Sequence, residues 1–297
     1  MPAARALSIT DVHVHIQPWE SFRPATLARM RAGRPDFDRI VEMGRDPELF
    51  LRYLDAAGVE RACLINYPAP VVMGFGDETS DFALSYTSSA RDRLLPVGGV
   101  HPRFSRDPAG DVARLADKGI RALKLHPPHM LVRAESHMEP SPEGAALASI
   151  YATAQERRLP IIIHTGTSVF PGARSRLGDP IGIDDVAVDY PDLRIIMAHG
   201  GRPLWSETCF FLMRRHPNVW LDLSGIPPRN LPAYFPRLNE ISGRVLFGTD
   251  WPSPGVKEIG GNLEDFLGLP EGYLPDAAKR AIVQDNALAL FPRQTLS

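Results

Sequence analysis

Long apolar runs, charge of one sign and cysteine are all scarce in this sequence, and each scarcity argues against a class of protein. No stretch approaches the roughly 20 apolar residues that a membrane-spanning helix needs. The 297 residues carry 33 Lys and Arg against 35 Asp and Glu, a net charge of −2 without blocks of like charge. This balance argues against nucleic acid and anionic membranes as partners. The N-terminal Met1–Arg5 has no apolar signal core behind it, and the two cysteines, Cys63 and Cys209, lie in apolar surroundings. We therefore expect buried thiols in a cytoplasmic protein, in preference to a disulfide or a metal pair.

Linkers and phosphate-binding glycine motifs are also missing. No Gly-rich fingerprint follows the first expected strand, which removes the main argument for a dinucleotide-binding fold. No Pro/Gly/Ser linker or shift in composition divides the chain, so we expect one domain over residues 1–297. Hydrophobic residues make up 44% of the chain and charged residues 23%, a composition that can bury a large core.

Eight short apolar runs, each ending in polar residues, alternate with helical segments. The expected strands are Leu7–His15, Arg61–Asn66, Leu94–His101, Ile120–His126, Pro160–Thr165, Leu193–His199, Asn218–Ser224 and Arg244–Asp250. Helices are expected over Pro47–Gly58, Asp107–Gly119, Glu143–Arg158, Trp205–His216 and Asp276–Leu290. Near-continuous apolar strands indicate a parallel sheet covered on both faces. Eight such units in one α/β chain favour a closed (β/α)₈ TIM barrel.

Three connections are too long to be simple turns. They are Gln17–Asp46 after the first strand, Pro127–Pro142 after the fourth and Gly166–Pro180 after the fifth. All three leave the C-terminal ends of strands, where the active sites of such barrels lie. We interpret them as insertions that form a lid and substrate walls, with functionless surface insertions as the alternative.

Histidines gather at the ends of the expected strands. Six of the nine lie there: His13, His15, His101, His126, His164 and His199. Side chains alternate along a strand, so the imidazoles of His13 and His15 share a face and could reach one ion. His164 ends the fifth strand, His199 the sixth, and Asp250 the eighth. The alternative is a set of core histidines and a helix-capping aspartate, which requires five matching strand ends to arise by accident.

This ordered set resembles the amidohydrolase superfamily, and most closely its amidohydrolase-related, aminocarboxymuconate-semialdehyde decarboxylase-like branch. The resemblance covers essentially the whole chain and rests on His13-Val14-His15, His164, His199 and the segment Gly248-Thr249-Asp250-Trp251-Pro252. It implies a metal-dependent enzyme in which His13, His15, His164 and Asp250 bind one divalent ion, usually zinc, with manganese or a second ion as alternatives. It also implies that His199 lies beside the metal-bound water and is catalytic together with Asp250.

The residue types agree with that implication. Three neutral imidazoles and a carboxylate suit zinc or a similar ion and leave one position open. Zinc lowers the pKa of a bound water to about 7. Lys124 and His126 are two residues apart on the fourth strand, so their side chains share a face. Lys124 is therefore expected to point into the barrel. Binuclear superfamily members use a carbamylated lysine on this strand, so Lys124 and His199 could hold a second ion. With one ion, Lys124 would instead pair with a substrate carboxylate or oxyanion.

Further residues are candidates for substrate contacts. They are His101, His126, Arg174, Arg176, Arg202, Trp19 and Trp251, all at or after strand ends. The arginines favour an anionic substrate, since a guanidinium binds carboxylates bidentately, although each could be a solvated loop charge. The two tryptophans could form an aromatic wall, and core packing is the alternative for Trp251.

These features predict a metal-dependent hydrolase that cleaves an amide, ester or lactone bond in a small, carboxylate-bearing substrate. One alternative is a non-oxidative decarboxylase of an aromatic or unsaturated acid, because relatives with the same ligands catalyse both reactions. A metal-free lactonase and a non-catalytic barrel are further alternatives. A homodimer is expected only by analogy with the branch.

Overall fold

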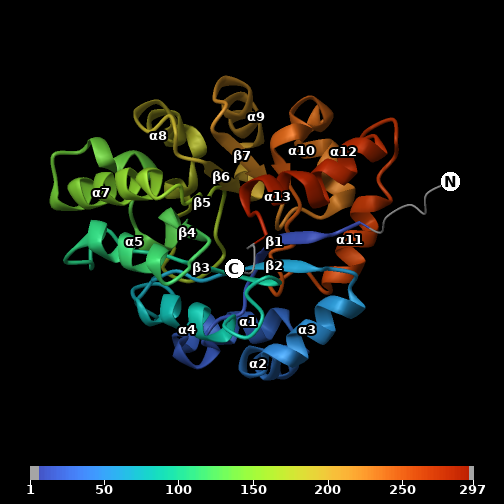
Figure 1. The fold of residues 1–297 in the computed structure, drawn as a ribbon, viewed down its shortest axis with the longest axis horizontal. Coiled ribbons are helices and arrows are strands. Elements are labelled where there is room, and N and C mark those ends of the chain that lie inside the picture. Colours follow the sequence, from blue (N-terminus) through green and yellow to red (C-terminus); the bar gives the residue numbers. More distant parts are fainter. Residues whose placement is uncertain (1–6, 294–297) are drawn as a thin grey trace.

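Eight parallel strands form the centre of the computed structural model, which describes residues 7–293 (Figure 1). Their order in the sheet follows the chain, from β1 to β8, and every neighbouring pair is parallel. The strands are β1 Thr10–Val14, β2 Arg61–Ile65, β3 Leu94–Gly98, β4 Ala122–Leu125, β5 Ile161–His164, β6 Ile195–Ala198, β7 Val219–Asp222 and β8 Val245–Leu246. The predicted TIM barrel is confirmed, with strands shorter than the apolar runs that predicted them.

The barrel closes where β1 meets the segment that follows β8. Val12 N–H donates to Phe247 O at 2.9 Å, and further along Asp250 N–H donates to His13 O at 2.8 Å. His15 N–H donates to Trp251 O at 2.7 Å. The closing hydrogen bonds therefore join the backbone of the histidine pair directly to that of the aspartate.

Helices surround the strands (Figure 1). Several begin with a polar residue followed by proline, as at Asp46-Pro47, Asp107-Pro108 and Ser141-Pro142, and in each the polar side chain accepts a hydrogen bond from the first turn. The helices are α1 Pro24–Gly33, α2 Phe37–Arg45, α3 Pro47–Ala56, α4 Glu78–Tyr86, α5 Pro108–Asp117, α6 Pro127–Met130, α7 Pro142–Glu156, α8 Ile183–Asp189, α9 Ser206–Arg215, α10 Leu231–Tyr234, α11 Ile259–Leu267, α12 Asp276–Arg280 and α13 Asn286–Leu290.

The helix expected over Asp276–Leu290 is interrupted, because a π-helical turn over Ala281–Asp285 separates α12 from α13. The three long connections have structure of their own. The first contains α1 and α2, the second α6 and a 3-10 helix, Ala134–Met138, and the third a 3-10 helix, Ser175–Gly178.

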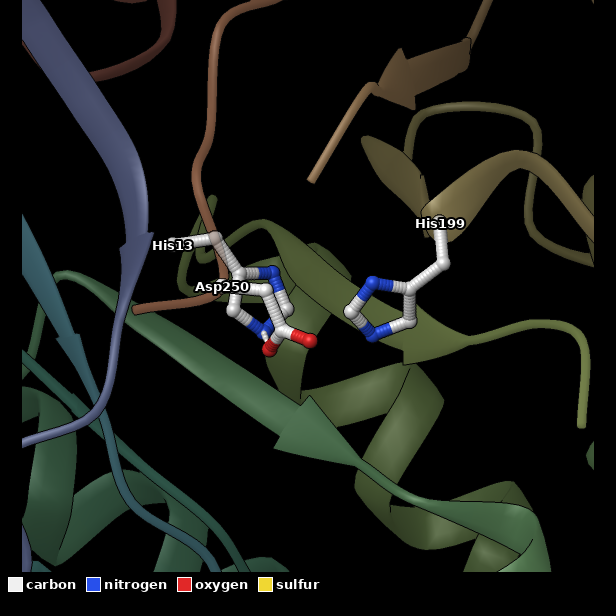
Figure 2. Close-up of side chains that lie close together, drawn as sticks. All are labelled: His13, His199 and Asp250. Carbon is white, nitrogen blue, oxygen red and sulfur yellow. Dashed lines mark ion pairs between the residues drawn. The ribbon is translucent and has the colours of Figure 1, made fainter. Parts of the chain in front are cut away.

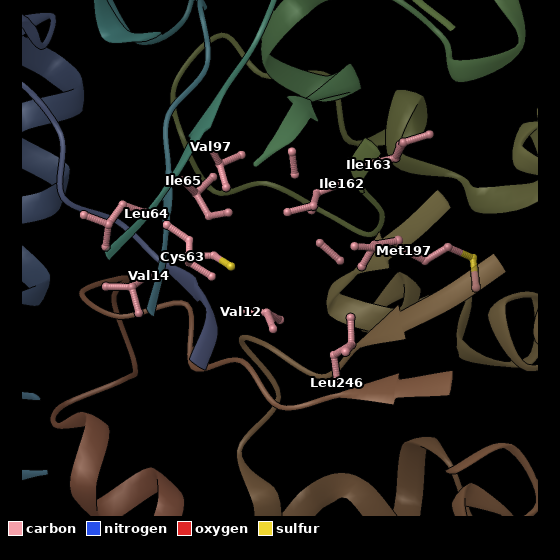
Figure 3. Close-up of a cluster of buried hydrophobic side chains, with 14 of the residues drawn as sticks. Val12, Val14, Cys63, Leu64, Ile65, Val97, Ile162, Ile163, Met197 and Leu246 are labelled. Carbon is pink, nitrogen blue, oxygen red and sulfur yellow. The ribbon is translucent and has the colours of Figure 1, made fainter. Parts of the chain in front are cut away.

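Apolar side chains fill both sides of the strands (Figure 3). Every residue of the eight strands is buried except Trp220, which is half-buried. This explains why the strands read as continuous apolar runs instead of alternating ones. Cys63 and Cys209 are buried free thiols, as expected. Within residues 7–293, no helix combines the length and apolarity that crossing a membrane would require.

Candidate active site

Three of the predicted residues meet at the carboxyl ends of the strands. His13, His199 and Asp250 each offer a ligand-type atom, and these atoms lie within 4.8 Å of one another (Figure 2). His13 Nε2 lies 3.6 Å from Asp250 Oδ1, and His15 Nε2 lies 3.2 Å from the same oxygen. Four side chains from β1, β6 and the end of β8 therefore point at one small volume.

His164 completes the group at slightly longer range. Its ring centre is 4.6 Å from that of His199, and its Nε2 is buried without a hydrogen-bond partner in the described chain. His13 Nε2 is also buried without a hydrogen-bond partner among the described residues. The sequence assigned His164 to the ligands and His199 to a position beside the water, whereas the tightest cluster in the structure contains His199.

Hydrogen bonds on the far side of three rings fix which nitrogen carries the proton. His13 Nδ1 lies 2.5 Å from Asp222 Oδ2, His199 Nδ1 lies 3.0 Å from the carbonyl oxygen of Ser224, and His15 Nδ1 lies 3.2 Å from that of Ile65. Carboxylate and carbonyl oxygens only accept, so each Nδ1 is the donor. The Nε2 lone pairs of His13 and His199 are therefore free at the centre of the site.

Burial controls the charges of the cluster. It lowers the pKa of His13, His164 and His199 well below the ordinary value, so these rings are neutral. Burial alone would raise the pKa of Asp250. The close contact of His15 Nε2 and the nearby charges, including Arg202, outweigh it and hold that pKa below its usual range. The site thus combines neutral imidazoles with an ionised carboxylate.

This donor set fits a divalent metal ion. Ligands 2.0–2.1 Å from a tetrahedral ion stand about 3.3 Å apart, close to the 3.2 and 3.6 Å between the two β1 imidazoles and Asp250. Buried Nε2 atoms without partners are costly unless something binds them. His13, His15, His164, His199 and Asp250 are the residues that could hold such an ion.

Asp222, which sequence reasoning missed, connects two of these histidines. It ends β7, is fully buried, and accepts hydrogen bonds from Ser224 N at 2.8 Å and Ser224 Oγ at 2.9 Å as well as from His13. Ser224 in turn holds His199. Burial raises the pKa of Asp222 to about 7, an effect that neighbouring Lys124 opposes. The only sequence signal was a polar residue ending an apolar strand, with Ser224 two positions further on.

Two residues of the cluster, His199 and Asp250, have an unusual backbone conformation that sets the direction of their side chains. His199 has φ 70° and Asp250 has φ 68°, in the left-handed region that residues other than glycine rarely adopt. Such residues cost of order 1–3 kcal/mol each and cluster at functional sites. Asp11 supports this segment, because its carboxylate accepts from His13 N–H, Thr249 N–H and Thr249 Oγ1 at 2.7–3.0 Å.

A cavity of about 130 Å³ opens beside the cluster. Its volume is similar to the roughly 150 Å³ that accommodates one benzene ring in an engineered protein cavity. Its polar wall includes Lys124, His126, Arg202 and four of the residues that could hold the ion, His15, His164, His199 and Asp250. Its apolar wall includes Trp19, Phe22, Met30 and Phe170. The connections after β2 and β8 also contribute, through Tyr67, Met73 and Pro252–Pro254, which the sequence did not indicate.

Two cations approach the cavity with unused hydrogen-bond donors. Lys124 is 2% exposed, its Nζ has no partner among residues 7–293, and burial lowers its pKa to about 8. Arg202 places Nη2 3.6 Å from Asp250 Oδ2, and its Nε is buried without a partner in the same range. Gly225 allows this approach, since a Cβ there would lie 2.4 Å from Nη2 of Arg202. Both donors are available to an anionic group in the cavity.

Four predicted substrate contacts lie away from the lining of this cavity. His101 packs on Phe104 with ring centres 4.5 Å apart, and Arg174 and Arg176 line a separate cleft with other arginines. Trp251 is 1% exposed and packs between helix residues Phe50 and Tyr53 of α3. Core packing thus accounts for Trp251.

A (β/α)₈ barrel that gathers histidines and an aspartate at the carboxyl ends of its strands defines a class of metal-site barrel proteins. Comparison with known sequences narrows this class: the pattern of the amidohydrolase family matches residues 10–293. The chain belongs to the amidohydrolase family.

Individual relatives are more distant. A 2-pyrone-4,6-dicarboxylate hydrolase of Comamonas testosteroni is 29% identical over 157 residues, covering 41% of this chain and 50% of its own length. The chain thus matches about half the length of that curated relative. A TIM-barrel protein of Bordetella bronchiseptica superposes with a TM-score of 0.75 at 22% identity, covering 97% of this chain and 99% of the other. The 5-carboxyvanillate decarboxylase of Sphingomonas paucimobilis gives 0.60 at 16% identity, with 97% and 100% covered. These two structural likenesses show a shared fold.

Proposed function

We propose that the chain is a metal-dependent hydrolase that opens an ester bond, and specifically a lactone, in a small ring compound bearing carboxylates. The observation that carries this proposal is the convergence of Nε2 lone pairs and the Asp250 carboxylate beside two cations with unused donor groups, Lys124 Nζ and Arg202 Nε. One ion held by His13, His15, His164 and Asp250 is the simplest occupant, and zinc suits this donor set. When bound, it would polarise the substrate carbonyl and acidify a water molecule.

The protein groups have separate tasks in this reaction. Asp250 is ionised, so its carboxylate accepts the proton of the attacking water. His199 is neutral with Nδ1 donating to Ser224, so its Nε2 orients that water and can take up a proton in turn. Lys124 and Arg202 bind the carboxylates of the substrate, and the apolar wall with Trp19 packs against its ring.

The choice of substrate class follows from the cavity and the relative. The cavity is of a size for one ring, and its cations favour acid groups on that ring. The sequence relative from Comamonas testosteroni is named for a pyrone dicarboxylate, a lactone with this description. The buried free thiols Cys63 and Cys209 support a reducing, cytoplasmic setting for the reaction.

Non-oxidative decarboxylation of an aromatic acid is the second candidate. It requires a proton to be delivered to a ring carbon, whereas Asp250 is held in the ionised form that accepts protons. His199 would have to supply the proton, and burial keeps that ring neutral. The curated relative from Comamonas testosteroni is named as a hydrolase, which favours hydrolysis.

Incubation with 2-pyrone-4,6-dicarboxylate in H₂¹⁸O tests the proposal. The chain would be loaded with zinc, loaded with manganese, or stripped with chelator, and the products analysed by mass spectrometry. Hydrolysis predicts a ring-opened acid carrying one ¹⁸O, formed only by the metal-loaded protein. Release of carbon dioxide without ¹⁸O incorporation would contradict hydrolysis and establish the second candidate. Equal activity after chelation would contradict the role of the metal.

A further inference from the structure

Three side chains from separate connections form a hydrogen-bonded chain in the cavity wall. His129, on α6, contacts Tyr67 Oη through Nδ1 at 2.9 Å and Ser168 Oγ through Nε2 at 2.7 Å. Tyr67 follows β2 and Ser168 follows β5, and all three line the cavity. None of them belongs to the metal-candidate cluster, and the proposed mechanism gives none of them a task.

The direction of these hydrogen bonds follows from burial. Tyr67 is 2% exposed, and burial raises the pKa of its phenol well above the usual range, so it keeps a proton that needs an acceptor. His129 Nδ1 is the acceptor it meets among the described residues. Burial also lowers the pKa of His129 to about 3, so the ring is neutral. With Nδ1 accepting, the single ring proton lies on Nε2 and is donated to Ser168 Oγ.

Ser168 is then left with a proton and no acceptor for it. Its Oγ accepts from His129 Nε2 and from Phe170 N–H at 3.4 Å, which uses both lone pairs of the hydroxyl. Within residues 7–293, the hydroxyl forms no hydrogen bond as a donor to a further acceptor, and the side chain lines the cavity. The proton is therefore available to a molecule in the cavity.

We infer that Ser168 is a specificity-determining residue that donates a hydrogen bond to a carboxylate or carbonyl oxygen of the substrate. Tyr67 and His129 are positioning residues that fix the Ser168 hydroxyl as a donor. The inference rests on the proposed function in one respect, the assignment of a ring acid or lactone as the ligand. A hydroxyl locked as a donor selects oxygen acceptors and discriminates against groups that can only donate, since such a pair leaves both protons unsatisfied.

Stacked histidine rings connect this hydrogen-bonded relay of Tyr67, His129 and Ser168 to the cluster of residues that could hold the metal ion. The His129 ring stacks on His126 at 3.5 Å between centres and 10° between planes, and His126 stacks on His164 at 3.8 Å and 16°. The stack fixes the distance from the Ser168 donor to the cluster. A substrate whose reacting carbonyl lies at the cluster thus meets Ser168 with another part of its ring system.

Nitrogen NMR of the full chain labelled with ¹⁵N-histidine tests the direction of the relay. The expected signal for His129 is a neutral ring with its proton on Nε2 and an unprotonated Nδ1. Assignment uses the disappearance of the signal in His129→Gln. A proton on Nδ1, or a doubly protonated ring at neutral pH, would overturn the inference.

Ligand binding tests the role of the hydroxyl without requiring turnover. The probe is benzene-1,3-dicarboxylate, an unreactive ring diacid, and its dissociation constant is measured by calorimetry. Ser168→Ala should weaken binding about tenfold, as expected for one hydrogen bond to a charged acceptor. Ser168→Thr should restore binding to within about threefold. Ser149→Ala removes a hydroxyl on α7 that bonds only the carbonyl oxygen of Ala145, so it should leave the constant unchanged.

A double-mutant cycle separates a relay from independent structural effects. Tyr67→Phe should weaken binding by less than Ser168→Ala, and the double variant should be no weaker than Ser168→Ala alone. Additive losses, wild-type affinity in Ser168→Ala, or an equal loss in Ser149→Ala would each overturn the inference. A wild-type protein that fails to bind the diacid would overturn it as well. A chain that hydrolyses no pyrone yet shows the non-additive pattern would refute the proposed function and leave the relay standing.

Discussion

Asp222→Asn is the substitution that best isolates how the barrel prepares its histidines for a metal ion. The wild-type carboxylate lies 2.5 Å from His13 Nδ1 and accepts its proton, which leaves the lone pair of Nε2 free for a metal. An amide whose oxygen takes the place of Oδ1 can keep the bond from the Ser224 backbone N–H. Its NH₂ group then meets His13 Nδ1–H as a second donor, so the ring must move its proton to Nε2 or turn away.

The expected magnitude follows from that geometry. Removal of a carboxylate that orients a metal-binding histidine typically costs 10–100-fold in metal affinity. Because the amide also opposes the required tautomer of His13, we expect the upper end, about 100-fold, or roughly 2.7 kcal/mol.

The assay is competition for zinc between the full chain and a chromogenic chelator at pH 7.5. Asp184→Asn is the matched control, because Asp184 bonds His216 Nε2 at 2.7 Å far from the cluster. It should leave zinc affinity unchanged. An Asp222→Asn protein that is folded and binds zinc within about threefold of wild type would refute the reasoning.

Two further predictions test the charges of the site, and a third tests the buried ring of His101, which lies outside it. Asp250→Asn should lower kcat by at least about 10³-fold with an unchanged circular dichroism spectrum, because the proton acceptor is lost; a substantially active variant would contradict its role. Lys124→Met should raise KM about 10–100-fold through loss of a charged partner for the substrate carboxylate, while metal analysis still finds one ion per chain; a fall from two ions to one would instead make Lys124 a bridging ligand. Burial lowers the pKa of His101 to about 4, so the unfolded chain binds its proton first as the pH falls below about 6.5, and stability is lost from there down to pH 4. His101→Gln should therefore reduce the loss of unfolding free energy over this range by about 3 kcal/mol in urea titrations, and an unchanged pH dependence would show that the ring is not buried in neutral form.

The strands were predictable because burial on both faces imposes a local pattern. Each of the eight runs contains an observed strand, and each run is longer than that strand. The residues beyond the last hydrogen bond between strands do not differ in type from those within the strand, so the sequence does not show where pairing ends. The side chains of His13 and His15 also lie on the same face, with ring centres 5.2 Å apart, although the register between β1 and β2 is irregular.

Contacts made by loops could not be predicted in the same way. Trp251 directly follows Asp250, whose left-handed backbone turns the chain, and its ring packs in the helix layer against Phe50 and Tyr53. The Tyr67, His129 and Ser168 chain joins three connections whose paths depend on tertiary packing. A lone aspartate such as Asp222 has no sequence feature that distinguishes it from other polar residues ending a strand.

Metal analysis combined with anomalous diffraction tests the central claim most directly. Protein purified without chelator and reconstituted with zinc should contain one ion per chain. The ion should lie within about 2.2 Å of His13 Nε2, His15 Nε2 and an Asp250 oxygen, ligand distances typical of zinc. Zinc that binds stoichiometrically elsewhere on the chain, with this cluster left without an ion, would contradict the account.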